Sequence, residues 1–209
     1  MHAYTRGNNR KQIYFDEFDY VAWLRLVDRA VARFGWTCHA FCLMPNHYHL
    51  LLETSQARLS AGMRHLNGSF AQRINRRYNG TGHVFEGPYR IEVVEKESHL
   101  LELCRYIPLN PVRAGLARGA EDWRWSSYRA TAGLEHAPSF LRTAFVRSLF
   151  GRETTAVTAY REFVRAGELA APATSRDLVP GRGGFGRWGL RSDGSGARRV
   201  NGARRSAPV

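Results

Sequence analysis

The sequence is poor in cysteine and in long apolar runs, and each shortage argues against a class of protein. Its 209 residues include only three cysteines, none in Cys-x-x-Cys spacing, so neither a disulfide framework nor a zinc ribbon is expected. No apolar run is long enough to cross a bilayer, and the first residues lack the charged-then-apolar pattern of a signal peptide. We therefore expect an intracellular, cytoplasmic protein that does not contact a membrane.

Acidic residues and lysine are also scarce. Asp and Glu number 18 against 31 Lys and Arg, which gives a formal net charge of +13 and a pI of about 10.5. Only Lys11 and Lys96 are lysines, a bias that a GC-rich genome alone would produce, so the informative part is the sign of the charge. A positive surplus of this size indicates a polyanionic partner, most often nucleic acid.

The composition changes near the C-terminal end. Residues 170–209 carry eight arginines, two aspartates and eight glycines with hardly any apolar periodicity, which predicts a disordered basic tail. The remaining chain is assigned to a main domain at 1–130 and a helical extension at 131–169.

Apolar periodicity and turn residues predict an α+β fold. Helices are expected at residues 16–34, at 57–78 and from about Ser98. Strands are expected at residues 36–44 and 47–54, joined by Pro45-Asn46, with a further extended segment through about Glu95. This order favours helices packed on an antiparallel sheet.

The same periodicity predicts which side chains are buried. For the first helix they are Phe18, Val21, Leu24, Val27, Val31 and Phe34. For the second helix they are Leu59, Met63, Leu66, Phe70 and Ile74. Cys38 and Cys42 are expected on one face of the first predicted strand, as small buried hydrophobes.

The stretch MPNHYHLLLE, residues 44–53, places two histidines around one tyrosine. Side chains alternate along a strand, so His47 and His49 share one face, while Tyr48 points into the core with Leu50 and Leu52. The two histidine Cα atoms would lie roughly 6–7 Å apart, close enough for both imidazoles to reach one ion. The alternative is a pair of exposed or core-satisfied histidines, and the motif alone does not choose between the two.

The stretch RYIPLNP, residues 105–111, could supply what such a site lacks. Tyr106 and Asn110 are four residues apart and so share a helix face. The phenol could attack an electrophile, and the amide oxygen could complete a His-His-Asn site suited to Mg²⁺ or Mn²⁺. Pro108 lies between them and would kink the helix. The alternative is that Asn110-Pro111 ends the helix and Tyr106 packs inward.

These two stretches, the second read through RYIPLNPVRAGL, resemble motifs of the HUH single-tyrosine transposases, specifically the REP-associated tyrosine transposase group of bacteria. RGNNR at 6–10, GHVFEGPYR at 82–90 and WRWSSYRA at 123–130 fit the same pattern in the same order. The resemblance covers about residues 1–130, with a weaker echo at 160–167. It implies a ferredoxin-like antiparallel sheet with a metal on the central strands and the tyrosine on a helix across from it.

The resemblance also implies a role for each site residue. His47 and His49 match the HUH histidines, and Asn110 matches the third ligand of a divalent metal, Mg²⁺ or Mn²⁺. Tyr106 matches the nucleophile that cleaves single-stranded DNA, becomes joined to a 5′-phosphate and frees a 3′-hydroxyl. The expected activity is metal-dependent cleavage and strand transfer at DNA hairpins, by a nucleoid-associated monomer or homodimer.

Arginines are expected to neutralise DNA phosphates. The candidates are Arg6, Arg10, Arg73, Arg76, Arg77, Arg90 and Arg113. Two departures from the family pattern keep a second interpretation open, a catalytically inactive nucleic-acid-binding regulator or decayed transposase. The first strand starts later than is usual in the family, which predicts a weakened sheet edge, and the basic tail differs from the usual C-terminal part.

Overall fold

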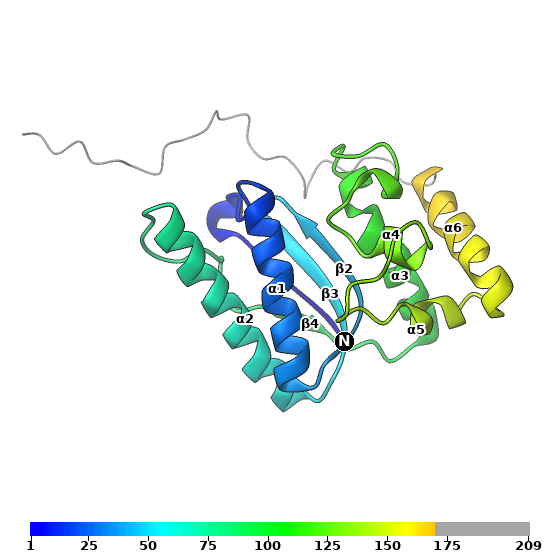
Figure 1. Cartoon of the computed structure of the whole chain (residues 1–209), viewed down its shortest axis with the longest axis horizontal. Coiled ribbons are helices and arrows are strands. Elements are labelled where there is room, and N and C mark those ends of the chain that lie inside the picture. The colour runs from blue at the N-terminus through cyan, green and yellow to red at the C-terminus, as the bar shows by residue number, and fades with distance from the viewer. Residues whose placement is uncertain (170–209) are drawn as a thin grey trace, which may run out of the picture.

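The computed structural model describes residues 1–169, and the predicted basic tail at 170–209 lies outside that range. In chain order the elements are β1 (His2–Arg6), η1 (Asn8–Arg10), α1 (Glu17–Phe34), β2 (Thr37–Met44), β3 (His47–Glu53), α2 (Gln56–Arg77), β4 (Arg90–Glu92), α3 (Glu97–Arg113), η2 (Ala120–Asp122), α4 (Tyr128–Thr131), α5 (Thr143–Ser148) and α6 (Glu153–Leu169) (Figure 1). The expected helices and hairpin strands are all present. None of these helices has the length and apolarity needed to cross a lipid bilayer.

The four strands form one antiparallel sheet in the order β2-β3-β1-β4. With the connectivity β1-α1-β2-β3-α2-β4, this is the ferredoxin-like arrangement that the family resemblance implied. β1 is an interior strand, paired with β3 along its length and with β4 from His2 to Tyr4. The expected weak edge is therefore wrong, because β1 has a partner on each side.

Both faces of the sheet are covered by helices (Figure 1). α1 and α2 cover one face, where Tyr48, Leu50 and Leu52 of β3 are buried in a core with both helices. α3 and the helices that follow it cover the other face, where Leu51 packs with Ile107 of α3. The alternation predicted for β3 is confirmed, since its even-numbered residues face α1 and α2 while His47 and His49 face α3.

A β-bulge makes β2 change face part-way along. Its pairing with β3 shifts register between Cys38 and Ala40, so side chains beyond the bulge point to the opposite face. Cys38 lies in the core under α1 and α2, whereas Cys42 lies in the core under α3. The prediction that the two cysteines share a face is wrong for this reason, although both are buried as expected.

α1 has the expected ends but buries a different stripe of its surface. Asp16 caps its first turn by accepting from the backbone N–H of Asp19, and Gly35 ends it at a φ of 63°. Phe18 and Val21, both predicted inward, are 72% and 37% exposed. The apolar residues that α1 buries are Tyr20, Trp23, Val27 and Ala30.

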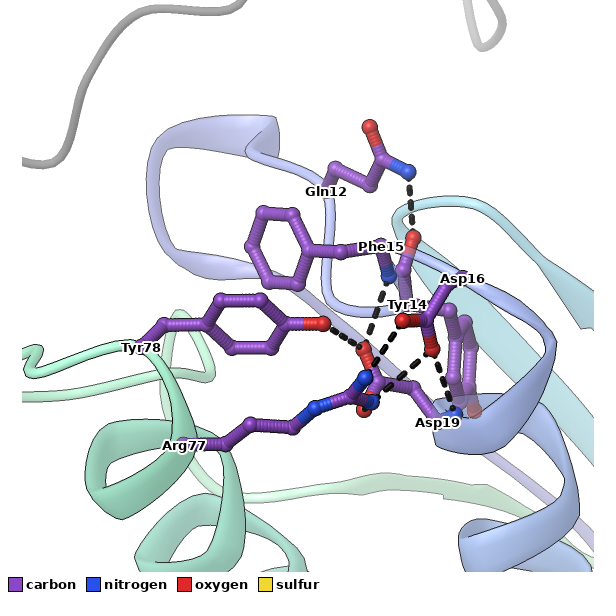
Figure 2. A network of polar contacts seen from close by, with 7 residues as sticks. All are labelled: Gln12, Tyr14, Phe15, Asp16, Asp19, Arg77 and Tyr78. Carbon is purple, nitrogen blue, oxygen red and sulfur yellow. Dashed lines mark hydrogen bonds and ion pairs between the residues drawn. The ribbon is translucent and has the colours of Figure 1, made fainter.

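A buried carboxylate explains this rotation of α1 (Figure 2). Asp19 is fully buried and accepts from the backbone N–H of Phe15 at 3.0 Å and from the Tyr78 hydroxyl at 2.8 Å. The Arg77 guanidinium, at the end of α2, donates to both Asp19 and Asp16. Its hydrogen bonds lower the pKa of the Asp16 carboxyl. A buried charge needs its partners. This network therefore keeps the side of the first turn that carries Asp19 facing the core.

The segment that follows α3 returns to the sheet and then to α3 itself. Along the outer edge of β2, the indole of Trp123 donates to the Leu43 carbonyl, and the Leu43 N–H donates to the Trp125 carbonyl, each at 2.9 Å. The WRWSS motif thus covers a strand edge that would otherwise be open for pairing. Residues 131–169 contribute α5 and α6, and α6 packs against α3; the division between a domain and an extension stays a prediction.

Arg77→Ala is expected to lower the free energy of unfolding by about 1–3 kcal/mol, because Asp19 would stay buried without its ionic partner. Arg76→Ala is the matched control, since the neighbouring arginine is exposed and should change stability by less than about 0.5 kcal/mol. Urea unfolding of the two variants and the wild type measures both values. Equal losses for the two variants would contradict a stabilising role for the network.

Candidate active site

A cleft of about 910 Å³ opens between α3 and the sheet. His47 and His49 of β3 line it together with Tyr106 and Asn110 of α3, so the structure gathers the four predicted site residues at one place. The cross-strand register explains how β1 and β4 contribute, because residues opposite one another in a sheet share a face. On that face, the residues of β1 and β4 that line the cleft are His2, Tyr4, Arg6, Arg90 and Glu92, and Thr5 of β1 also lines it.

The two histidines lie side by side and are buried. Their ring centroids are 5.1 Å apart with the rings nearly perpendicular, and the residues are 6% and 4% exposed. The Tyr106 ring lies edge-on to His49, with 5.4 Å between centroids. The exposed-histidine alternative is therefore wrong. The core-satisfied alternative stays open for His49, since its Nδ1 lies 3.0 Å from His2 Nε2, while its buried Nε2 makes no hydrogen bond by geometry within residues 1–169.

Asn46 fixes the orientation of His47 and joins it to the RGNNR loop. The Asn46 side-chain oxygen lies 2.7 Å from His47 Nδ1, so that nitrogen carries a proton and donates it. The other end of the Asn46 amide donates to the Arg10 carbonyl at 3.0 Å. Gly7 is required in this loop because a Cβ there would lie 2.1 Å from the Lys11 carbonyl oxygen. The loop thereby brings Arg10 to the cleft.

α3 continues through both of its prolines and ends at Arg113, so the alternative in which Asn110-Pro111 ends the helix is wrong. Pro111 has no N–H to give to the Ile107 carbonyl four residues earlier. The Asn110 side-chain nitrogen lies 3.4 Å from that carbonyl oxygen and 2.8 Å from the Tyr106 carbonyl oxygen. With Nδ2 turned to the backbone, Oδ1 is the atom of Asn110 that can serve as a ligand in the cleft.

A family model described as "Transposase IS200 like" matches residues 1–110, which contain all four of these residues and make up more than half of the chain. The chain belongs to the IS200-like transposase family. Enzymes of this family typically cleave DNA, and they generally depend on a metal ion.

Solved structures similar to this transposase include two that are described as transposases. One is described as a REP-associated tyrosine transposase bound to a REP hairpin; it has 14% identity and a TM-score of 0.54, with 68% of this chain and 84% of the other covered. Another is a candidate transposase from Deinococcus radiodurans R1, with 21% identity and a TM-score of 0.39, covering 51% and 85%. No curated protein sequence matches the chain.

The residues present in the transposase fit a divalent ion. Two imidazoles and one amide oxygen, from His47, His49 and Asn110, form a mixed nitrogen and oxygen donor set. The buried Nε2 of His49, which has no hydrogen-bond partner among the described residues, is in the state expected of a ligand atom. Residues 1–169 hold no cluster of three or more His, Cys, Asp or Glu side chains arranged to bind a metal.

The electrostatics of the cleft keep His49 neutral. Burial holds the pKa of His49 well below its ordinary value, and the nearby His47, His2 and Arg6 lower it further. The Asn110 side chain acts in the opposite direction. Burial also lowers the pKa of His2, against the raising effect of Glu92. Only a neutral imidazole can bind a metal, so this environment prepares His49 for that role.

The seven predicted arginines divide into two groups. Arg6, Arg10, Arg90 and Arg113 line the cleft, and the Arg113 guanidinium lies 5.3 Å from the centre of the Tyr106 ring. The other three lie on α2, which packs on the opposite face of the sheet, and do not line the cleft. Among these, Arg73 and Arg76 are exposed and Arg77 is engaged with Asp16 and Asp19.

The sequence analysis missed residues that line the cleft or contact its histidines, among them His2, Tyr4, Asn46 and Glu92. The Tyr4 hydroxyl donates to Glu92 at 3.5 Å, and Glu92 in turn contacts His2. Strand alternation in HAYTR could have placed His2, Tyr4 and Arg6 on one face. It could not have shown that this face meets the histidine pair.

Mn²⁺ is expected to raise the Tm of the transposase, because an ion that binds only the folded state stabilises it by about 2.7 kcal/mol at 100 times its Kd. His49→Ala should lose most of this shift. His39→Ala is the matched control, since His39 is also a buried histidine of the sheet but pairs with Glu53 outside the cleft. Calorimetry with and without Mn²⁺ measures each shift, and equal shifts in both variants would contradict the assignment.

Proposed function

We propose that this transposase cleaves and rejoins single-stranded DNA at hairpins through a 5′-phosphotyrosine on Tyr106. The observation that carries the proposal is the position of Tyr106, whose ring lies 5.4 Å from His49 in a cleft lined by four arginines. Tyr106 and the histidine pair lie on different elements and are more than 50 residues apart in the sequence. Their meeting in one cleft is what this chemistry requires.

In the proposed reaction the Tyr106 hydroxyl oxygen attacks the scissile phosphorus. A bond forms between that oxygen and phosphorus, the bond from phosphorus to the 3′-oxygen breaks, and the phenolic proton is lost while the 3′-oxygen gains one. A phenol with an ordinary pKa near 10 is a weak nucleophile at neutral pH. Arg113, over the Tyr106 ring, favours the negative charge that develops on the phenol oxygen.

A divalent ion, Mg²⁺ or Mn²⁺, held by His47, His49 and Asn110 would polarise the scissile phosphate and offset the charge of the transition state. The residues of the chain supply the ligand atoms and hold them in position. His47 and His49 supply imidazole nitrogens from one strand, and Asn110 holds its side chain against the helix that carries Tyr106. Because the phosphotyrosine bond conserves the phosphodiester, a 3′-hydroxyl can attack it and rejoin the strand without another energy source.

The proposed substrate is a DNA hairpin with an unpaired segment at the cleft. Arg6, Arg10 and Arg90 are placed to neutralise phosphates at the cleft. Arg73 and Arg76 are assigned to more distant phosphates, and Arg77 could join them only by leaving its carboxylate partners. The structural relative described as bound to a REP hairpin supports this partner class. We place the reaction in the cytoplasm, at the nucleoid, with the protein acting as a monomer or homodimer.

The test uses single-stranded hairpins from DNA flanking the gene, labelled at either end, with purified protein and Mn²⁺ or Mg²⁺. Denaturing protein gels should show a covalent band that carries the label from the 3′ side of the cut. Tyr106→Phe and EDTA should each abolish that band, by at least about 100-fold for the variant.

Tyr4→Phe supplies the matched comparison, because Tyr4 is another tyrosine lining the cleft, and there the covalent band must persist. Hairpin binding by a folded, metal-loaded protein without any adduct would replace this proposal with a non-catalytic regulator. Cleavage without an adduct would indicate a metal-dependent nuclease.

A further inference from the structure

His2 connects two strands at the base of the cleft. The residue is 3% exposed and belongs to β1, between Glu92 of β4 and His49 of β3. His2 Nδ1 lies 3.1 Å from a carboxylate oxygen of Glu92, and His2 Nε2 lies 3.0 Å from His49 Nδ1. The three side chains therefore form a continuous line that ends at the buried Nε2 of His49.

The chemistry of the two ends decides where the protons lie. A carboxylate only accepts hydrogen bonds, so His2 Nδ1 must carry the proton that lies between it and Glu92. In a neutral imidazole the other nitrogen is then an acceptor, and His49 Nδ1 must donate to it. This leaves His49 Nε2 with a lone pair directed into the site.

The opposite arrangement of protons is unfavourable at the Glu92 end. The unprotonated Nδ1 of His2 would then face the Glu92 carboxylate at 3.1 Å, two acceptors with no proton between them. A doubly protonated His2 would avoid that contact but would place a cation on a side chain that is almost fully buried. Glu92 itself is held on its other oxygen by the Tyr4 hydroxyl at 3.5 Å.

We propose that Glu92 and His2 are positioning residues that set the tautomer of His49, so that its Nε2 is available as a metal ligand. The proposal rests on the proposed function in one respect, the assignment of His49 as a ligand. Carboxylate–histidine contacts behind a ligand typically change metal affinity by about 10–100-fold. Here a second imidazole extends that contact, which lets the half-exposed Glu92 act on a buried atom.

The direct test reads the tautomers in the metal-free full chain. With ¹⁵N-labelled histidine, long-range ¹H–¹⁵N correlation should show His49 protonated at Nδ1 and unprotonated at Nε2. His2→Phe removes the acceptor, and Glu92→Gln allows His2 to turn its protons around, so each should shift His49 to a mixture of tautomers. His2→Gln restores a side-chain oxygen that can accept from His49 and should recover part of the wild-type signal.

Mn²⁺ titration by calorimetry gives the second readout. Kd should rise about 10–100-fold in His2→Phe and Glu92→Gln. Glu86→Gln is the matched control, because Glu86 lines the same cleft and loses the same charge without touching His2; its Kd should change by less than about threefold.

The possible results distinguish a failure of this proposal from a failure of the proposed function. A wild-type His49 protonated at Nε2, or His2→Phe and Glu92→Gln with unchanged tautomer and Kd, would overturn the proposal. Glu92→Gln keeps the test valid if His2→Phe does not fold, since Glu92 is half-exposed. The tautomer measurement needs neither metal nor DNA. A protein that shows the predicted tautomer but forms no covalent adduct would therefore refute the proposed function and leave this inference standing.

Discussion

The pairing of β1 with β3 holds the site together. In this register Tyr4 lies opposite His49 and Arg6 lies opposite His47, so polar side chains from two distant segments gather on one face. If β3 shifted by one residue relative to β1, the two histidines would point into the apolar core and Tyr48 would point into the cleft. That shift is disfavoured on both faces, because α1 and α2 bury one set of side chains and α3 buries part of the other.

The two walls of the cleft are rigid for different reasons. The sheet wall is a ladder of backbone hydrogen bonds in which both histidine rings are also held from behind, one by Asn46 and one by His2. The helix wall contains two prolines, which restrict the backbone, and the Asn110 amide bonds back to it. A catalytic arrangement benefits when its groups are already in place before the substrate arrives.

The parts of this arrangement that depend on local chain geometry could be predicted from the sequence. Alternation placed His47 and His49 on one face, and four-residue spacing placed Tyr106 with Asn110. The resemblance to a known family supplied the ferredoxin-like order of the sheet. Contacts that depend on strand order could not be found in this way. His2 and Glu92 are 90 residues apart, and no pattern within either segment indicates the other.

Two local predictions were wrong because tertiary contacts took precedence. Phe18 fits an apolar helical stripe, but the ion pair between the buried Asp19 and Arg77 fixes the rotation of the helix differently. Cys38 and Cys42 fit one face of a regular strand, but the register shift between them separates the faces. A helix rotation and a bulge both leave the hydrophobic content of the segment unchanged, so neither can be predicted from its composition.

That bulge makes the number of residues in β2 as important as their identity. On one side of it Cys38 faces α1 and α2; beyond it Ala40, Cys42 and Met44 face α3. Loss of a residue beyond the bulge, such as Ala40, with the bulge itself kept, would reverse the faces of the residues that follow, bringing Phe41 and Leu43 to the α3 side. Evolution can therefore substitute one apolar residue for another along this strand, whereas a change in its length beyond the bulge would disturb both sides of the sheet at once.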